Sequence, residues 1–309
     1  MNATPPSTLL VTCALIAVQI LFGVNYVISK TVVDAFPPLV WASIRIVIAT
    51  GIMGTIAILS RRKHPTGGRN FFLPLIVFAL FGTIINQSSF LVGLRYTSAT
   101  NSAILNTMIP VFTLLIVTVR GQEPLTWRRG IGFVLAFAGV LAIRKVENFT
   151  LSDQTAFGDF LTVLNCLSYG IFLTYSKKFM EQNDRVWVTV WMFLYGSIGI
   201  GLVALPDWIH FSQPTLTPAL LWAMAFSILG GTILTYFLNF WALAYARSSS
   251  VALFIYLQPI FAAFLAWAWH HEIPSLRTMI SGLMIFAGMI FALETASKNS
   301  TKGTVPARS

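Results

Sequence analysis

Uncharged polar side chains recur at helical spacing inside strongly apolar segments, and they are the residues of this sequence that could do chemistry. Thr232, Tyr236 and Asn239 follow one another at i, i+4 and i+7, which places them on one face of a helix. Asn86 and Gln87 lie inside another apolar segment. Side chains of the same kind stand in further segments at Asn25, Asn106, Tyr175 and Gln258. Amides and hydroxyls can hydrogen-bond both ends of a zwitterion without a permanent charge of their own, so the pattern predicts binding of a small polar molecule.

A polar residue inside an apolar helix also has a purely structural interpretation. In a membrane helix such a residue normally faces the bundle interior or a wet cavity. Hydrogen bonds between helices there typically contribute about 0.6–2 kcal/mol. For any single residue, ligand binding and interhelical bonding stay equally open. We expect that several of these residues together line one cavity.

Arg45 is the one clear charge within an apolar segment. A charge at the bilayer centre costs about 3 kcal/mol on insertion scales. Arg45 lies toward the outer end of its segment, from where a long side chain can extend to the membrane surface and lower that cost. It could also meet a carboxylate of a bound molecule.

Two residue pairs punctuate the apolar segments. Pro110 and Pro259 lie near the middle of their segments, where a proline removes a backbone hydrogen bond and tends to kink the helix. They are either hinges that flank the cavity or static kinks needed for packing. Glu123 and Glu272 follow the same two segments, and a carboxylate that caps the next helix contributes about 0.3–1 kcal/mol. We favour capping over proton coupling, because no acidic residue lies at mid-membrane.

The sequence lacks the usual signatures of enzyme chemistry. No segment carries paired carboxylates, and neither a nucleotide-binding loop nor a Gly-x-Ser-x-Gly motif occurs. The adjacent His270 and His271 would project from different faces of a helix, so metal binding there is not expected. The sequence therefore predicts that the protein is not an enzyme and needs neither a metal nor a cofactor.

Composition places all of these residues in a membrane protein. The 309 residues are 56% hydrophobic and only 10% charged, whereas a soluble domain usually carries about 25% charged residues. The formal net charge of +10 comes from Lys and Arg in short clusters between apolar segments. That distribution does not form the basic face of a nucleic-acid-binding protein. The expected partners are the lipid bilayer and a small molecule, without nucleic acid, and a monomer is compatible with the sequence.

A helix that crosses the hydrocarbon core needs about 20 mostly apolar residues, and ten segments fit this requirement. They are Leu9–Ser29, Leu39–Leu59, Phe71–Gly93, Ser98–Val119, Arg128–Ile143, Gly158–Phe179, Val186–Leu205, Ala219–Leu243, Ser248–Trp269 and Leu276–Leu293. With the N-terminus in the cytoplasm, fourteen Lys and Arg residues lie in inner loops and the tail and five lie outside. Basic residues concentrate in cytoplasmic loops, so both termini are expected in the cytoplasm.

The two halves of the chain resemble each other. A shift of 149 residues pairs Pro110 with Pro259, Glu123 with Glu272 and Tyr96 with Tyr245. Such matches indicate an internal repeat, with repeats at 1–150 and 151–309. Each repeat holds five segments, an odd number, so the second enters the membrane from the opposite side. The predicted fold is an all-α integral membrane protein of ten transmembrane helices, built as two inverted five-helix repeats around a central cavity. Inverted repeats let secondary transporters exchange inward-open and outward-open states around a midplane site.

Several motifs carry a resemblance to a known family. They read Phe22-Gly23-Val24-Asn25-Tyr26, Pro37-Pro38-Leu39-Val40-Trp41-Ala42-Ser43-Ile44-Arg45, Gly93-Leu94-Arg95-Tyr96-Thr97-Ser98-Ala99-Thr100-Asn101-Ser102-Ala103 and Gly121-Gln122-Glu123-Pro124. Together they resemble the EamA-type repeat of the drug/metabolite transporter superfamily, which would cover nearly the whole chain twice. The sequence departs from that pattern at Phe22, often Trp in the family, at His271 beside Glu272, and in lacking a second-half Arg to match Arg45.

This resemblance implies a ten-helix bundle with a central cavity that exports amino acids, aromatic ones included, from the cytoplasm through a bacterial inner membrane. It also implies a structural or gating role for Arg45, since the family places this Arg in members of every kind. A sugar-phosphate or nucleotide-sugar antiporter of the same fold is the alternative, although phosphates would call for several converging cations. An integral-membrane enzyme or a structural membrane protein represents a different class of function.

Overall fold

The computed structural model describes residues 6–97, 102, 105–143, 153–258, 261 and 276–300, and every regular element among them is helical. The first half contains α1 (Thr8–Ala35), α2 (Pro38–Leu59), α3 (Gly68–Ala79), η1 (Leu80–Ile85), α4 (Asn86–Tyr96), α6 (Met108–Val119) and α7 (Trp127–Ile143). The second half contains α8 (Asp153–Gln182), α9 (Arg185–Ile209), α10 (Pro218–Ile228), η3 (Leu229–Leu234), α11 (Thr235–Tyr245), α12 (Ser248–Leu253), η4 (Phe254–Leu257) and α14 (Leu276–Ser300).

Local sequence signals explain where several helices begin. The Ser7 hydroxyl accepts a hydrogen bond from the backbone of Leu10 at 3.3 Å and caps α1. Asp184 caps α9 and Thr217 caps α10 in the same way. Proline occupies the first position of α2 and of α10, where its missing N–H costs nothing.

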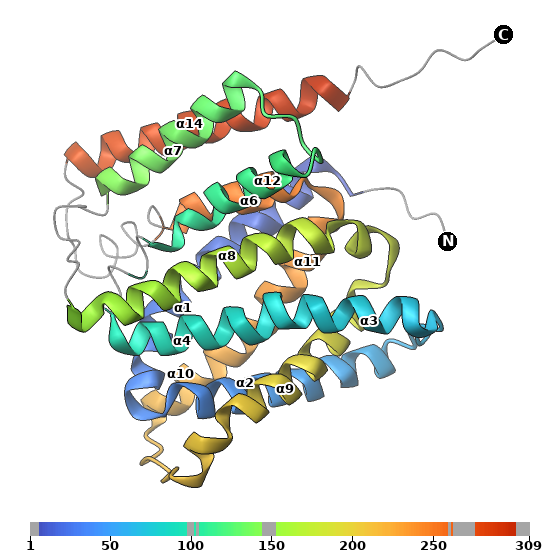
Figure 1. The fold of residues 1–309 in the computed structure, drawn as a ribbon, viewed down its shortest axis with the longest axis vertical. Coiled ribbons are helices and arrows are strands. Elements are labelled where there is room, and N and C mark those ends of the chain that lie inside the picture. Colours follow the sequence, from blue (N-terminus) through green and yellow to red (C-terminus); the bar gives the residue numbers. More distant parts are fainter. Residues whose placement is uncertain are drawn as a thin grey trace.

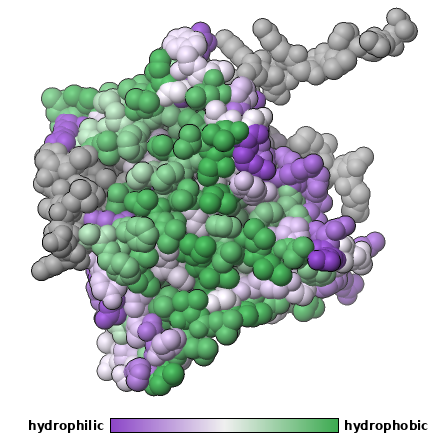
Figure 2. All heavy atoms as spheres, viewed as in Figure 1, coloured by the Kyte–Doolittle hydropathy of each residue, from purple (hydrophilic) through white to green (hydrophobic). Residues whose placement is uncertain are grey.

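Six helices are long and apolar enough to span a membrane among the residues that the structure describes. They are Thr8–Ala35, Pro38–Leu59, Gly68–Tyr96, Ala156–Gln182, Arg185–Ile209 and Pro218–Tyr245. Shorter apolar helices follow at Met108–Val119, Ser248–Leu257 and Met279–Ala292. Hydrophobic side chains cover most of the face seen in Figure 2, and hydrophilic ones gather toward its margins. The chain is therefore a multi-pass membrane protein, and six of the ten predicted spans are present at full length.

Two of the long helices are interrupted by a π-helical segment. Each of them, Gly68–Tyr96 and Pro218–Tyr245, contains six residues of π-helix, η1 and η3. The wider π-helical turns leave some carbonyls free for side chains. Accordingly, the hydroxyl of Ser168 donates to the Phe81 carbonyl at 2.6 Å and that of Tyr236 to the Gly82 carbonyl at 3.1 Å. Backbone carbonyls of η1 thus accept hydrogen bonds from side chains of α8 and α11.

Helices from the two halves pack on each other in pairs (Figure 1). α7 and α14 run side by side at one end of the longest axis, and α2 and α9 at the other end. The α7–α14 contact is close: a Cβ on Gly288 would lie 2.5 Å from the Ala136 nitrogen and 2.6 Å from the Gly132 carbonyl. Small residues of this kind allow backbones to approach.

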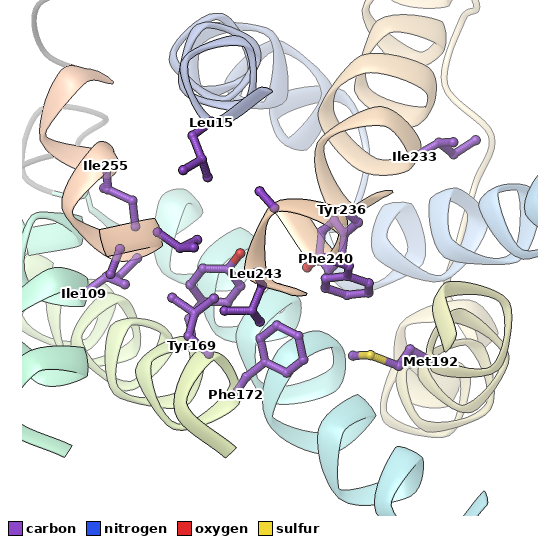
Figure 3. Packing of buried hydrophobic residues seen from close by; sticks show 14 of the residues in the cluster. Leu15, Ile109, Tyr169, Phe172, Met192, Ile233, Tyr236, Phe240, Leu243 and Ile255 are labelled. Carbon is purple, nitrogen blue, oxygen red and sulfur yellow. The ribbon is translucent and has the colours of Figure 1, made fainter. Parts of the chain in front are cut away.

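Aromatic rings fill the core between α8, α9 and α11. Phe240 lies 5.3 Å from Phe172 and 5.5 Å from Tyr236, between ring centroids, and Phe193 lies 5.3 Å from Tyr236. Figure 3 shows this cluster with Tyr169 beside it. Gly82 faces Phe172 so closely that a Cβ there would lie 2.6 Å from the ring. The packed rings hold the Tyr236 side chain in a fixed orientation at the edge of a cavity.

Candidate functional site

A partly open cavity of about 80 Å³ lies between helices of both halves of the chain. Its walls come from α1, α2, α4, α6, α8, η3, α11, α12 and η4, with Gln258 directly after η4. The lining residues are Gln19, Phe22, Asn25, Arg45, Asn86, Gln87, Phe90, Asn106, Ile109, Asn165, Tyr169, Leu173, Gly231, Tyr236, Asn239, Val251, Ile255 and Gln258. Amides and tyrosines dominate its polar part, and apolar side chains form the rest.

The structure brings most of the predicted binding residues together at this cavity. Seven of the eight line it, and all seven are buried: Asn25, Asn86, Gln87, Asn106, Tyr236, Asn239 and Gln258. Their helices are far apart in sequence, so the shared cavity is a property of the fold. What these residues bind remains a prediction.

Tyr175 does not belong to the site, so its assignment to the cavity was wrong. Its side chain is 50% exposed, and the guanidinium of Arg120 lies 3.6 Å from the centre of its ring. On the same helix, α8, the cavity is lined by Asn165, Tyr169 and Leu173. At about 100° per residue, Tyr175 lies roughly a third of a turn away from the centre of that stripe.

Two lining residues that the sequence prediction missed are Gln19 and Tyr169. Each had a usable signal. Gln19 is an amide within an apolar helix, six residues before Asn25, and Tyr169 follows Asn165 at i+4. Gly231 was also missed. A side chain does not fit at this position, because a Cβ there would lie 2.2 Å from the Asn25 side-chain oxygen. Glycine is the residue that lets Asn25 approach the π turn η3.

Arg45 is buried within the cavity wall, with 3% of its surface exposed. The expectation that it extends to the membrane surface was therefore wrong. One guanidinium nitrogen donates to the Ser227 hydroxyl at 3.4 Å, and another donates to the Gln87 side-chain oxygen. These partners stand on α10 and α4, and they hold the side chain inward.

A chain of hydrogen bonds runs from Arg45 across the cavity wall. The Gln87 amide nitrogen donates to the Tyr236 hydroxyl. The single hydrogen of that hydroxyl is shared between the Gly82 carbonyl at 3.1 Å and the Asn86 oxygen at 3.3 Å. The Asn86 nitrogen donates to Asn165. Each amide oxygen faces the preceding member of the series, counted from Arg45, and each amide nitrogen donates a hydrogen bond to the following member.

This series of hydrogen bonds ends just before α6, at Asn106 and Ser102. The Asn165 nitrogen donates to the Asn106 oxygen at 2.8 Å, and the Asn106 nitrogen donates to the Ser102 carbonyl at 3.0 Å. This directional order occupies the side-chain oxygens of Gln87, Asn165 and Asn106. Those oxygens are therefore poorly available to a bound ammonium group.

The other polar residues of the lining form fewer hydrogen bonds with one another. Gln258 donates to Gln19 at 2.8 Å, and Asn239 donates to the Tyr169 hydroxyl. The buried side-chain oxygen of Asn25 has no partner among the described residues. An unpaired buried acceptor is costly, and this oxygen packs against Gly231 of η3.

Of the predicted hinges, Pro110 is buried in the first turn of α6. The helical pattern is interrupted at Thr107, three residues before it, because a proline ring clashes with the preceding turn. The neighbouring Ile109 lines the cavity. Pro259 and Glu272 lie outside the described residues.

Glu123 does not cap the helix that follows it, contrary to expectation. Its carboxylate pairs with Arg129, and both side chains are at most 9% exposed. It accepts from the Ser249 hydroxyl and, at 3.3 Å, from the Ser249 backbone. Glu123 therefore caps α12, a helix of the other half, while Thr126 bonds the Arg129 backbone at the start of α7.

Within the described part of the chain, no group of three His, Cys, Asp or Glu residues is placed to hold a metal ion. The His270–His271 pair lies outside that part. The described lining contains one charged side chain, Arg45, and no carboxylate. The arrangement is suited to binding a small amphipathic molecule by hydrogen bonds, aromatic contacts and a single positive charge.

Comparisons with known proteins agree with a transport role. The sequence model of the EamA-like transporter family matches residues 9–145 and again residues 156–293. An uncharacterized transporter of Archaeoglobus fulgidus is 28% identical over 88% of this chain and 93% of its own length.

Two further comparisons bear on substrate and fold. An S-adenosylmethionine uptake transporter of Rickettsia bellii is 23% identical over 70% of this chain and 71% of its own length. A solved crystal structure with 15% identity aligns at a TM-score of 0.73, covering 94% of this chain and 99% of its own. That likeness concerns the fold alone.

Proposed function

The chain belongs to the EamA-like transporter family, and from that premise we propose that it is a secondary transporter that exports neutral and aromatic amino acids by alternating access. The observation that carries this proposal is the central cavity. It combines amides, tyrosines and apolar side chains with one cation and, among the described residues, no carboxylate. Amide, hydroxyl and guanidinium groups can donate hydrogen bonds to a carboxylate, and the aromatic faces suit apolar or aromatic side chains.

Alternating access rests on two inverted five-helix repeats, residues 1–150 and 151–309. Several observations support this arrangement. The family model matches twice in succession. The π turns η1 and η3 lie 149 residues apart in the sequence. Gln87 and Tyr236 are also 149 residues apart, and they form a hydrogen bond with each other. Thr50 and Ser197, 147 residues apart, also meet, with hydroxyl oxygens 2.9 Å from each other. Equivalent residues that touch are expected near a pseudo-twofold axis.

Lys30 and Lys177 support the same arrangement at the helix ends. Each pairs with an acidic residue four positions later, Asp34 or Glu181. Each also donates, at 3.5 Å, to a backbone carbonyl near the end of the next interrupted helix, at Leu94 or Ala244. The two halves thus build the same contact, which supports the proposed repeat.

In this proposal ten spans cross the bacterial inner membrane, with both termini in the cytoplasm. The six long helices account for six spans, and the shorter apolar helices and α7 belong to the other four. The start of α1, the end of α14 and the α2–α3 connection lie on one side of Figure 1. That side carries Arg61, Arg62 and Lys63, which favours the cytoplasm. Pro110 and Pro259 act as hinges between the two states.

Amino acids are favoured over phosphorylated substrates by charge. A sugar phosphate brings two negative charges and needs several converging cations, whereas the described cavity lining offers Arg45 alone. One relative is named for uptake of S-adenosylmethionine, a molecule that carries an α-amino carboxylate. The antiporter of sugar phosphates or nucleotide sugars remains the second candidate.

Reconstituted vesicles decide between these candidates. Purified protein in lipid vesicles is given labelled methionine, threonine, phenylalanine or glucose 6-phosphate in separate samples. We expect saturable flux of the amino acids, with overlapping competition among them, and no flux of the sugar phosphate. Flux of glucose 6-phosphate alone would replace the amino-acid proposal by the antiporter.

A further inference from the structure

Arg45 and Arg129 are buried to a similar degree but differ in their partners. Arg129 has 2% of its surface exposed and pairs with the carboxylate of Glu123. Arg45 has 3% exposed, and its hydrogen-bond partners are the neutral oxygens of Ser227 and Gln87. Among the residues that the structure describes, no carboxylate forms an ion pair with Arg45. The protein therefore neutralises a buried guanidinium where it serves packing and leaves one without a counter-ion in the cavity.

A buried cation without a counter-ion is energetically costly, and an incoming anion would relieve that cost. Guanidinium is the side chain best matched to a carboxylate, because its donors form two parallel hydrogen bonds. Two guanidinium nitrogens of Arg45 each donate one hydrogen bond to a named partner, out of five N–H groups in all. We infer that Arg45 is the anchor for the carboxylate of the transported molecule. This inference rests on the proposed function, that the cavity holds the substrate.

The cavity has fewer groups that could bind an ammonium than groups that could bind a carboxylate. No acidic residue occurs in its described lining, and the oxygens of Gln87, Asn165 and Asn106 already accept hydrogen bonds. The buried oxygen of Asn25 is left without a partner. That oxygen is neutral and packs against Gly231, so it supplies no charge to an ammonium group.

The asymmetry defines a substrate class. The cavity takes monocarboxylates with an apolar or aromatic side chain, and an α-amino group adds little to their binding. Deaminated analogues of amino acids should therefore compete for the site. Analogues whose carboxylate is removed or converted to an amide should not.

The test uses the wild-type protein in lipid vesicles and labelled phenylalanine as the transported probe. Unlabelled 3-phenylpropionate, phenylalaninamide and phenethylamine are compared as inhibitors. We expect 3-phenylpropionate to inhibit within about tenfold of unlabelled phenylalanine, and the other two to be weaker by more than about tenfold, a factor that corresponds to 1.4 kcal/mol. Inhibition by the amide as strong as that by the acid would overturn the inference and leave amino-acid transport intact.

Variants of Arg45 sharpen the result. Arg45→Gln removes the charge and should bring the inhibition constants of acid and amide to within about threefold of each other. Arg45→Lys keeps the charge and should retain the preference for the acid. If Arg45→Gln does not yield folded protein, the wild-type inhibitor series decides alone. If the wild type moves no phenylalanine, the proposed function fails, and ligand-induced thermal stabilisation by acid against amide still tests Arg45.

Discussion

At the scale of single residues, the Glu123–Arg129 pair shows how a buried charge links distant parts of the chain. The pair sits between α6 and α7 and reaches Ser249 at the start of α12. A buried ion pair gains little over apolar packing, but removing one partner leaves an uncompensated charge. The contact therefore holds the two halves together only while all of its members are present.

This contact predicts a large effect of Glu123→Ala on stability. Loss of the carboxylate strands the buried Arg129 and should destabilise the protein by about 3–5 kcal/mol. Thermal denaturation of the purified protein in detergent measures it as a lower midpoint. The control is Glu181→Ala, which breaks the more exposed pair with Lys177 and should cost at most about 0.5 kcal/mol. Equal midpoints for the two variants would contradict this account.

Tyr236 and Tyr175 form a natural pair for testing the cavity. The Tyr236 hydroxyl is buried and joins Gln87 to Asn86 and Gly82, whereas Tyr175 is half exposed. Tyr236→Phe leaves buried groups without a partner, a cost of about 1–3 kcal/mol, and should lower the affinity for amino acids roughly tenfold. Tyr175→Phe should leave transport unchanged. Binding constants for both variants are obtained from flux in vesicles. A stronger effect of Tyr175→Phe than of Tyr236→Phe would contradict the assignment of the site.

At the scale of helices, close packing of α7 on α14 joins the ends of the two halves. Gly132 and Gly139 on one helix face Gly288 and Ser281 on the other, with backbone atoms within 3 Å of where a Cβ would lie. Such contacts tolerate no added methyl group, since backbone cannot move aside easily. The crossing is therefore specified by the glycines.

Two glycines of α14 test this packing. A Cβ on Gly288 would lie 2.5 Å from backbone, whereas one on Gly282 meets nothing within 4 Å. Gly288→Ala should destabilise by about 1–3 kcal/mol through overpacking. Gly282→Ala should be neutral or slightly stabilising, since alanine favours a helix. Thermal midpoints in detergent decide, and a neutral Gly288→Ala would show that the helices separate without cost.

Much of the helix level could be predicted from sequence, because hydrophobic length marks a span and prolines and capping residues mark its ends. The π turns could not. Their residues, such as Gly82 and Thr83, read as ordinary helix, and the turns are accompanied by tertiary contacts from Ser168 and Tyr236. Seven of the polar cavity residues could be predicted because polar residues inside apolar helices tend to face the bundle interior, but the outward turn of Tyr175 depends on how α8 is rotated in the bundle. The inward side chain of Arg45 depends on Ser227, which is 182 residues away.

At the scale of the whole molecule, charge and repetition together define how the protein sits in the membrane. The basic residues favour a cytoplasmic location for both termini. Because each repeat has an odd number of spans, the second half would have the inverted orientation. Alternating access then needs the two halves to exchange conformations around the cavity. Orientation and exchange are separate properties, and each can be measured.

Orientation is tested by thiol labelling in intact cells. A single cysteine replaces Ser309 in a variant that carries Cys13→Ser, because Cys13 is exposed and Cys166 is buried. An impermeant maleimide added from outside should not label this cysteine until the cells are broken. Labelling in intact cells would place the C-terminus outside and reverse the assignment.

Counterflow in vesicles tests the central claim, that the cavity carries amino acids alternately to both sides. Vesicles that contain purified protein and an excess of unlabelled methionine are diluted into labelled phenylalanine. The account predicts that labelled phenylalanine accumulates transiently above its external concentration, and that Tyr236→Phe weakens this accumulation while Tyr175→Phe does not. Absence of any accumulation with folded wild-type protein, or equal accumulation with glucose 6-phosphate inside in place of methionine, would contradict it.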